Sequence, residues 1–496
     1  MLKYNLVYYI NSQERSGIRL MLFSSYEFVF AFLPITTVVY FALSKIKNPY
    51  PQRAFLAAAS LFFYSYFEWS YFLIIFASIV INFALAKISL GIQSQSFKKA
   101  LFILSVIFNV GLIGYYKYYD FTIDTVNTIA STDIPLKGIL IPLGISFFTF
   151  QQLSFQLRTL RTENKKLNFI DYTLFVSFFP QLIAGPIVLY DDLVPQIEDG
   201  KKRFFNKENF AIGFSVFTYG LFKKLIIADE LALIVDNGFR ASNPLGALPM
   251  WVTAFAYTFQ IYFDFSGYSE MAIGLGKMFN YDLPVNFLTP LRSASITEMW
   301  QRWHITLGRT LSELVYIPLG GNKKGKLRKK INLFIVFLVS GIWHGASWTF
   351  VLWGVAHGVA RVIEECCPKL LSKIPLFIRR VFTLLFIVFA FVIFRATSIA
   401  QAFDIFGQMF TVSDLGLGNF SKLLTNGVFG VPNFAAIALA FIAVGICFVI
   451  MLKEKKTSQF ICELKLTPKR AIITAAMLAI SVLCMSRSAV FIYFNF

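Results

Sequence analysis

The sequence is poor in charged residues, and poorest in acidic ones. Only 15% of its 496 residues are charged, and Asp and Glu together number 27 against 46 Lys and Arg. A soluble protein carries about 25% charged residues. Hydrophobic residues make up 57% of the chain and include 58 Phe, far more than one soluble core requires. This composition excludes an ordinary soluble protein and predicts a polytopic membrane protein whose surfaces face lipid.

Histidine is scarce, and the cysteines form no recognisable motif. The three histidines are His304, His344 and His357, and the five cysteines show neither metal-binding nor redox spacing. If one continuous helix carried His344 and His357, it would hold them about 20 Å apart and on nearly opposite sides. We therefore expect no metal site.

The sequence also lacks a signal peptide, a tandem repeat, a low-complexity linker and a soluble domain. We interpret residues 1–20 as a tail or an upstream extension of the reading frame, and residues 21–496 as a single transmembrane domain. The predicted fold class is an all-α bundle of about 11–13 membrane segments, several too short or too broken to be simple spans. The segments lie near 22–43, 54–68, 71–90, 100–117, 138–157, 170–189, 210–236, 250–279, 331–345, 346–364, 376–395, 432–452 and 470–487.

Positive charge is abundant, with a net charge of +19. The basic residues stand in short clusters between apolar runs, which is typical of cytoplasmic loops and not of a nucleic-acid-binding surface. The strongest cluster is "GGNKKGKLRKK" at 320–330. We expect this loop to be cytoplasmic and the chain to have no nucleic-acid partner.

Polar residues interrupt the apolar pattern in the middle of the chain. Asp264 and Glu270 fall within an apparent span, where a carboxylate normally faces a cavity or a partner. They either pair with arginine or cap a broken helix, or they line a polar cavity. The stretch 295–330 is too polar to cross lipid, and we expect a re-entrant or interfacial helix capped by Ser295 or Thr297.

Two histidines belong to this region. His304 lies near the first turns of the expected polar helix, and His344 lies within the apolar stretch "GIWHGASWTF" at 341–350. A neutral imidazole in a sheltered cavity can accept a proton from a hydroxyl that attacks an acyl group. The alternative is a hydrogen-bonded packing histidine. The second histidine, the broken helix and the intramembrane carboxylates favour the interpretation of His344 as a general base.

Many separate segments, in the right order, resemble the membrane-bound O-acyltransferase family, and within it the alginate O-acetylation branch. The likeness extends over residues 21–496. It rests on "MLFSSYEFVFAFLPI" (21–35), "LIPLGISFFTFQQLSF" (140–155), "FFPQLIAGPIV" (178–188), "GLFKKLIIAD" (220–229), "YFDFSGYSEMAIGLG" (262–276), "SITEMWQRWHITL" (295–307), "YIPLGGNKKG" (316–325), "GIWHGASWTFVLWGVAHG" (341–358) and "FIYFNF" (491–496).

The resemblance implies an O-acyltransferase, and specifically an O-acetyltransferase, with re-entrant helices around a central pore. It implies His344 as the catalytic histidine and His304 as a second histidine of the pore. The acyl donor would be acetyl-CoA or another cytosolic thioester, a substrate rather than a bound cofactor. Lys323, Lys324 and Lys326 would then attract its phosphates.

The resemblance also implies a setting. The protein would lie in the bacterial inner membrane, where periplasmic or membrane-anchored acetyltransferase partners place the acetyl group on an exported polysaccharide such as alginate. D-alanyl transfer toward teichoic acid and peptidoglycan O-acetylation remain alternatives within acyl transfer. A non-catalytic polysaccharide or lipid transporter is a further alternative, although the sequence shows no inverted repeat with matching broken helices.

Two places depart from the family pattern. Arg158 stands where an Asp is expected after "TFQQLSF", and Ser312 and Glu313 stand at Arg and Asp positions after "RWHITL". The charge reversal at position 158 should rearrange a salt bridge. Because both histidines are retained, these departures concern the choice of partner or substrate more than the reaction.

Overall fold

A computed structural model describes most of the chain. The described residues are 21–66, 68–162, 167–424, 432–455, 457, 461, 464–487, 489 and 491–492. Within these ranges all regular structure is helical and no strand occurs, which confirms the all-α fold class. The predicted tail at 1–20 lies outside the described residues.

The helices follow one another along the chain with short connections. The first group is η2 (Glu27–Phe32), α2 (Leu33–Leu43), α3 (Tyr50–Ser65), α4 (Trp69–Gly91), α5 (Gln95–Ile113), η3 (Gly114–Tyr118), α6 (Tyr119–Ala130), α7 (Ile145–Thr159), α8 (Phe169–Ser177), α9 (Phe179–Leu182) and α10 (Tyr190–Glu198). The second is α11 (Lys207–Phe222), η4 (Lys223–Ala228), α12 (Asp229–Arg240), α13 (Ala247–Met278), η5 (Pro290–Arg292), α14 (Ile296–Trp300), α15 (Ile305–Leu311), η6 (Ser312–Tyr316), α16 (Gly325–His344) and α17 (Trp348–Cys366). The third is α18 (Pro368–Lys373), α19 (Leu376–Arg395), α20 (Ile399–Phe410), η7 (Leu417–Asn419), α21 (Phe420–Leu424), α22 (Asn433–Lys453), α24 (Pro468–Cys484) and η8 (Met485–Arg487).

Five helical stretches in the described part of the chain are long and apolar enough to cross a membrane unaided. They are Trp69–Gly91, Gln95–Ala130, Lys207–Arg240, Leu376–Arg395 and Asn433–Lys453. Several other predicted segments are short or broken, as expected. Residues 170–189, for example, break between α8 and α9, where Phe178 is extended and Pro180 follows. Both short helices are buried within the protein, where other segments can satisfy their backbone polar groups.

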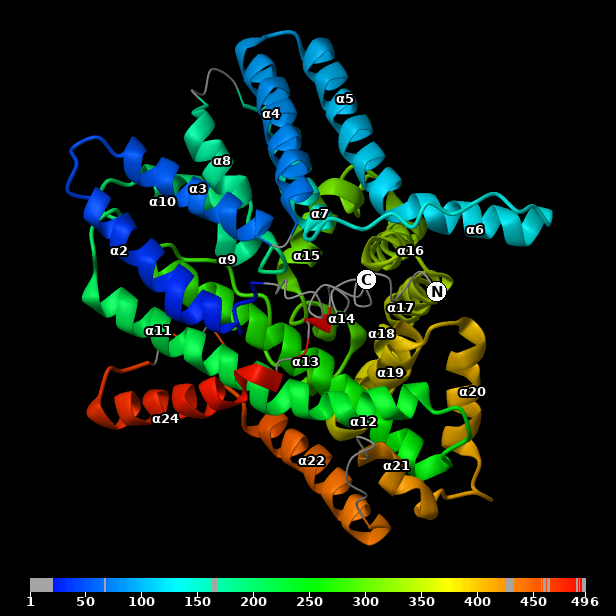
Figure 1. Cartoon of the computed structure of the whole chain (residues 1–496). Helices are drawn as coiled ribbons and strands as arrows, with labels where there is room; N and C mark the ends of the chain where they lie inside the picture. The colour runs from blue at the N-terminus through cyan, green and yellow to red at the C-terminus, as the bar shows by residue number, and fades with distance from the viewer. Residues whose placement is uncertain are drawn as a thin grey trace.

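Helix α13 lies in the middle of the bundle and packs along α11 (Figure 1). The two backbones approach closely at paired glycines: a Cβ on Gly220 would lie 2.5 Å from the carbonyl oxygen of Gly267. Small residues permit this spacing between membrane helices. Asp264 and Glu270 do not cap a broken helix, the alternative that the sequence allowed, because α13 is continuous through both.

Both carboxylates pair with lysines instead of the arginines expected from sequence. Lys223 and Lys224 are consecutive residues of the π-helical turn η4, which packs against α13. Lys223 Nζ lies 2.9 Å from Glu270 Oε1, and Lys224 Nζ lies 3.0 Å from Asp264 Oδ1. Glu454, which follows α22, also binds Lys223. The buried charges therefore link α13 to η4 and to the end of α22.

Candidate functional site

The chain reverses direction directly after His344. This residue ends α16, Gly345 is extended, and Ser347 caps the start of α17 by accepting a hydrogen bond from the Thr349 amide. The two helices pack side by side, and Lys329 near the start of α16 binds Glu365 near the end of α17. One helix therefore does not carry both His344 and His357, and the expected separation of about 20 Å does not apply.

Two tryptophans connect all three histidines. The ring of Trp343 lies 6.2 Å from that of His304 and 5.0 Å from that of His344. The ring of Trp353 lies 5.0 Å from that of His344 and 4.5 Å from that of His357. All five side chains are buried. We call this group the histidine–tryptophan cluster. In the described residues, no three His, Cys, Asp or Glu side chains converge as metal ligands would.

The sequence predicted one polar helix with His304 near its first turns, but His304 does not lie within such a helix. Ser295 caps the short α14, as predicted, but the chain then breaks before α15. His304 stands at this break with φ of 45°, in the left-handed region that a non-glycine residue adopts at a local energetic cost. Such strain at a buried histidine is typical of functional sites.

A hydrogen bond fixes the tautomer of His304. Its Nδ1 lies 3.1 Å from Oδ1 of Asn286, which also accepts a hydrogen bond from the Thr306 hydroxyl at 3.0 Å. The Asn286 amide nitrogen donates to Ser269, so the carbonyl oxygen is the atom that faces His304. Because that oxygen can only accept, Nδ1 carries the proton and the neutral ring keeps its lone pair on Nε2. This is the tautomer that a proton acceptor requires.

Asn286 was not found from the sequence, and its role gives a prediction. Replacing Asn286 with leucine should lower the rate of acyl transfer about 100-fold, because the tautomer of His304 is no longer fixed. Asn286→Asp should keep most of the activity, since a carboxylate also accepts from Nδ1. Initial rates of the purified variants test this. Equal losses in the two variants, at equal yields of monodisperse protein, would contradict it.

Lys117 holds the end of the helix that carries His344. The last carbonyl groups of a helix have no partner within it. Lys117 Nζ donates to the carbonyl oxygens of Trp343 and His344, at 2.7 and 3.1 Å. Tyr118 donates to the carbonyl of Ile342. Both side chains come from the π-helical turn η3 inside the long stretch Gln95–Ala130. No sequence signal pointed to this role, because Lys117 is one of three lysines in that stretch.

His357 has a different environment. Its Nδ1 accepts a hydrogen bond from the Trp300 indole at 3.2 Å, which joins α17 to α14. Trp300 also contacts Trp353, with ring centres 5.7 Å apart. His357 thus packs against the aromatic side chains that surround the other two histidines.

Phe491 and Ile492 lie near the same site. The Asp264 carboxylate accepts a hydrogen bond from the Ile492 amide at 2.8 Å. The ring of Phe491 lies 5.8 Å from that of Phe265, whose ring is in turn 4.7 Å from that of His304. Asp264, which is paired with Lys224, therefore holds Ile492 next to Phe491, whose ring packs near that of Phe265 beside His304.

The lysines predicted to attract the donor lie elsewhere. Lys323 and Lys324 are exposed in the turn that leads into α16, and Lys326 is exposed in the first turn of that helix. His344 is at the other end of this helix, about 28 Å away along its axis. The structure therefore does not bring these lysines to the histidines. On the same side, a hydrogen bond from Lys329 holds the pKa of Glu365 below its usual range.

Comparison with known proteins identifies the family. A model of the membrane-bound O-acyltransferase family matches residues 29–403. The peptidoglycan O-acetyltransferase of Helicobacter pylori is 39% identical over 81% of this chain and 82% of its own. The probable alginate O-acetylase AlgI of Pseudomonas aeruginosa is 37% identical over 85% of this chain and 81% of its own. The teichoic acid D-alanyltransferase of Bacillus subtilis is 27% identical over 45% of this chain.

The family match spans about three quarters of the chain and includes the region that holds all three histidines. The protein is therefore a member of the membrane-bound O-acyltransferase family, a membrane-embedded O-acyltransferase of helical fold.

Proposed function

We propose that this protein takes acetyl from a cytosolic thioester donor and delivers it through the bacterial inner membrane for O-acetylation of an exported polysaccharide. The observation that carries the proposal is the buried histidine–tryptophan cluster within a chain of this family. The similarity to polysaccharide O-acetylating enzymes over four fifths of the chain supports acetyl as the acyl group and a polymer as its destination.

The proposed reaction uses His344 as the general base. Its imidazole accepts the proton of an acceptor hydroxyl as that oxygen attacks the thioester carbonyl. The carbon–sulfur bond then breaks, and the leaving thiolate takes up the proton. The buried indole N–H groups of Trp343 and Trp353 have no hydrogen-bond partner among the described residues. Each is able to donate to the oxyanion that develops on the carbonyl oxygen. His304 supplies a second lone pair, at Nε2.

The polymer and the partners also belong to the proposal. By their names, one of the relatives reported above acts on peptidoglycan and the other on alginate, and the two are nearly equally identical to this chain. Either polymer is consistent with the proposed function. The D-alanyltransferase matches less than half of this chain. A periplasmic or membrane-anchored acetyltransferase would complete the transfer, because the polymer lies outside the cytosol.

The test is acetyl transfer by purified protein. Radiolabelled acetyl-CoA is supplied with alginate or peptidoglycan fragments, with and without the periplasmic partner. We expect donor consumption, and polymer-bound label when the partner is present. Consumption of a D-alanyl carrier protein in place of acetyl-CoA would redirect the proposal to D-alanylation. No consumption of any thioester would favour a transport role.

The orientation in the membrane gives a second prediction. The loop 320–330 should be cytoplasmic, so a cysteine at Lys326 should resist a membrane-impermeant thiol reagent in intact cells and react after lysis. Cys366 and Cys367 lie at the end of α17 and are first replaced by serine. Asp133→Cys, beyond the end of α6, serves as the control expected to react in intact cells. Labelling at position 326 in intact cells would place the loop outside the cytoplasm and would contradict a donor side that includes this loop.

A further inference from the structure

A cavity lies outside the histidine–tryptophan cluster, between the last turns of α7, the start of α10 and η6. Its volume is about 300 Å³. Its polar lining comprises Ser154, Arg158, Arg161, Tyr190, Asp191 and Glu313. Its volume lies at the lower end of the range typical of small-molecule sites, and polar side chains make up most of its lining. Arg158 and Glu313, two positions at which the sequence departs from the family pattern, face this one cavity.

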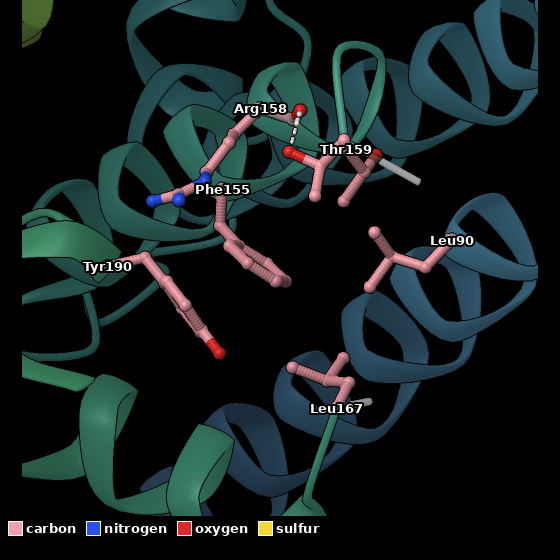
Figure 2. A pocket seen from close by; sticks show the side chains of 7 residues that line it. Leu90, Phe155, Arg158, Thr159, Leu167 and Tyr190 are labelled. Carbon is pink, nitrogen blue, oxygen red and sulfur yellow. Dashed lines mark hydrogen bonds between the residues drawn. The ribbon is translucent and has the colours of Figure 1, made fainter. Parts of the chain in front are cut away.

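Arg158 is presented for anion binding. Its guanidinium lies 5.4 Å from the centre of the Tyr190 ring, which stacks on Phe155 at 4.4 Å. Figure 2 shows the guanidinium directed away from Leu90 and Leu167. Its ion-pair partner, Asp191, is 61% exposed, and Arg158 itself is 32% exposed. Asp191 is the exposed side of this pair, and an ion pair with an exposed carboxylate contributes little. A phosphate, which accepts two parallel hydrogen bonds from a guanidinium, is able to displace Asp191.

The cavity lies at the far end of the helix that borders His304. On α7, the Phe147 ring is 6.4 Å from that of His304, and the Phe150 ring stacks on Trp343 at 5.3 Å. Arg158 is three turns further along α7, about 16 Å from Phe147. Between them, the Ser154 hydroxyl donates to Glu313 at 3.0 Å. An extended phosphopantetheine arm spans a distance of this order, with amide groups along its length that can hydrogen-bond to such a polar wall.

We propose that Arg158 and Arg161 bind the phosphate of a phosphopantetheine thioester, with the thioester end directed along α7 toward the histidine–tryptophan cluster. This inference rests on the proposed acyl transfer and names the groups that recognise its donor. Coenzyme A and an acyl carrier protein share this phosphate. The exposed lysines at 323, 324 and 326 raise the local concentration of the anion but do not hold it.

The test compares donors with and without the phosphate. KM is measured for acetyl-CoA and for S-acetylpantetheine, which has no phosphate. Arg158→Gln should raise KM for acetyl-CoA about tenfold, because a charge-assisted hydrogen bond is lost, and should leave KM for S-acetylpantetheine unchanged. Asp191→Asn should lower KM for acetyl-CoA, because Arg158 no longer has a competing partner. Lys99→Gln, an exposed lysine outside the cavity, is the matched control for loss of one positive charge.

Several results would overturn the inference. Equal changes in KM for both donors in Arg158→Gln would indicate a structural role only. A raised KM for acetyl-CoA in Lys323→Gln but not in Arg158→Gln would place the phosphate on the lysine turn. A repeat of the KM measurement with an acetylated carrier protein identifies the source of the phosphate. If Arg158→Gln changes KM neither for acetyl-CoA nor for the acetylated carrier protein, the inference is overturned. Binding of coenzyme A by calorimetry separates the two proposals: Arg158-dependent binding without acetyl transfer would retain this inference and reject the proposed function.

Discussion

Replacing His344 with alanine is expected to abolish acetyl transfer while the protein remains folded and inserted. Alanine leaves no group at the end of α16 to accept the proton of the attacking hydroxyl, and general base catalysis typically contributes about 10² to 10⁴ in rate. The ring of His344 contacts those of Trp343, Trp353 and Phe394 at the end of α16. Its removal should therefore leave the rest of the helix packed and the bundle folded. Polymer-bound acetate in cells, and donor consumption by purified protein, measure the effect.

The matched control is another histidine of the same cluster. His357→Gln keeps an acceptor for the Trp300 indole and should retain most of the activity. Wild-type acetylation in His344→Ala would remove His344 from the mechanism. Equal losses in His344→Ala and His357→Gln would mean that the cluster acts through packing alone.

Replacing Lys117 with methionine should lower kcat about 100-fold with little change in KM. Methionine has a similar length but no donor, so the carbonyl groups of Trp343 and His344 lose their partner and the end of α16 is no longer fixed. A displacement of about 1 Å at a catalytic group is enough for a loss of this size. Steady-state kinetics with acetyl-CoA measure the effect.

Lys98 provides the control for Lys117. It is also buried, belongs to the same long helix, and donates to the carbonyl of Thr162 at 3.2 Å, away from the histidines. Lys98→Met should lower thermal stability without a comparable loss of kcat. Lys117→Arg retains a donor and should recover part of the activity. A uniform fall in stability and activity in both methionine variants would show that Lys117 has no specific part in placing His344.

Features that depend on neighbouring residues could be predicted from the sequence. The length and spacing of apolar runs indicated a helical membrane bundle, since a span must satisfy its backbone internally and cover the hydrocarbon core. The Ser295 cap followed from local hydrogen bonding at a helix start. The apolar run at 346–364 corresponds to α17.

Features that depend on which distant segments pack together were decided only by the tertiary structure. The pattern showed that Asp264 and Glu270 needed partners, but not that two consecutive lysines of a π-helical turn supply them. The sequence placed His344 and His357 on one axis, whereas a reversal at Gly345 brings both against Trp353.

The contacts that fix His304 and His344 show the same limit. Asn286 sets the tautomer of His304, and Lys117, more than 200 residues earlier in the chain, holds the carbonyl of His344. An asparagine and a lysine carry no local pattern that points to a histidine, because a hydrogen bond across the fold requires only that two atoms meet at the right distance and angle. The loop after α13, which carries Asn286 and accepts a hydrogen bond from the Ile305 amide, and the Lys117 hydrogen bonds to the end of α16 are what make them meet.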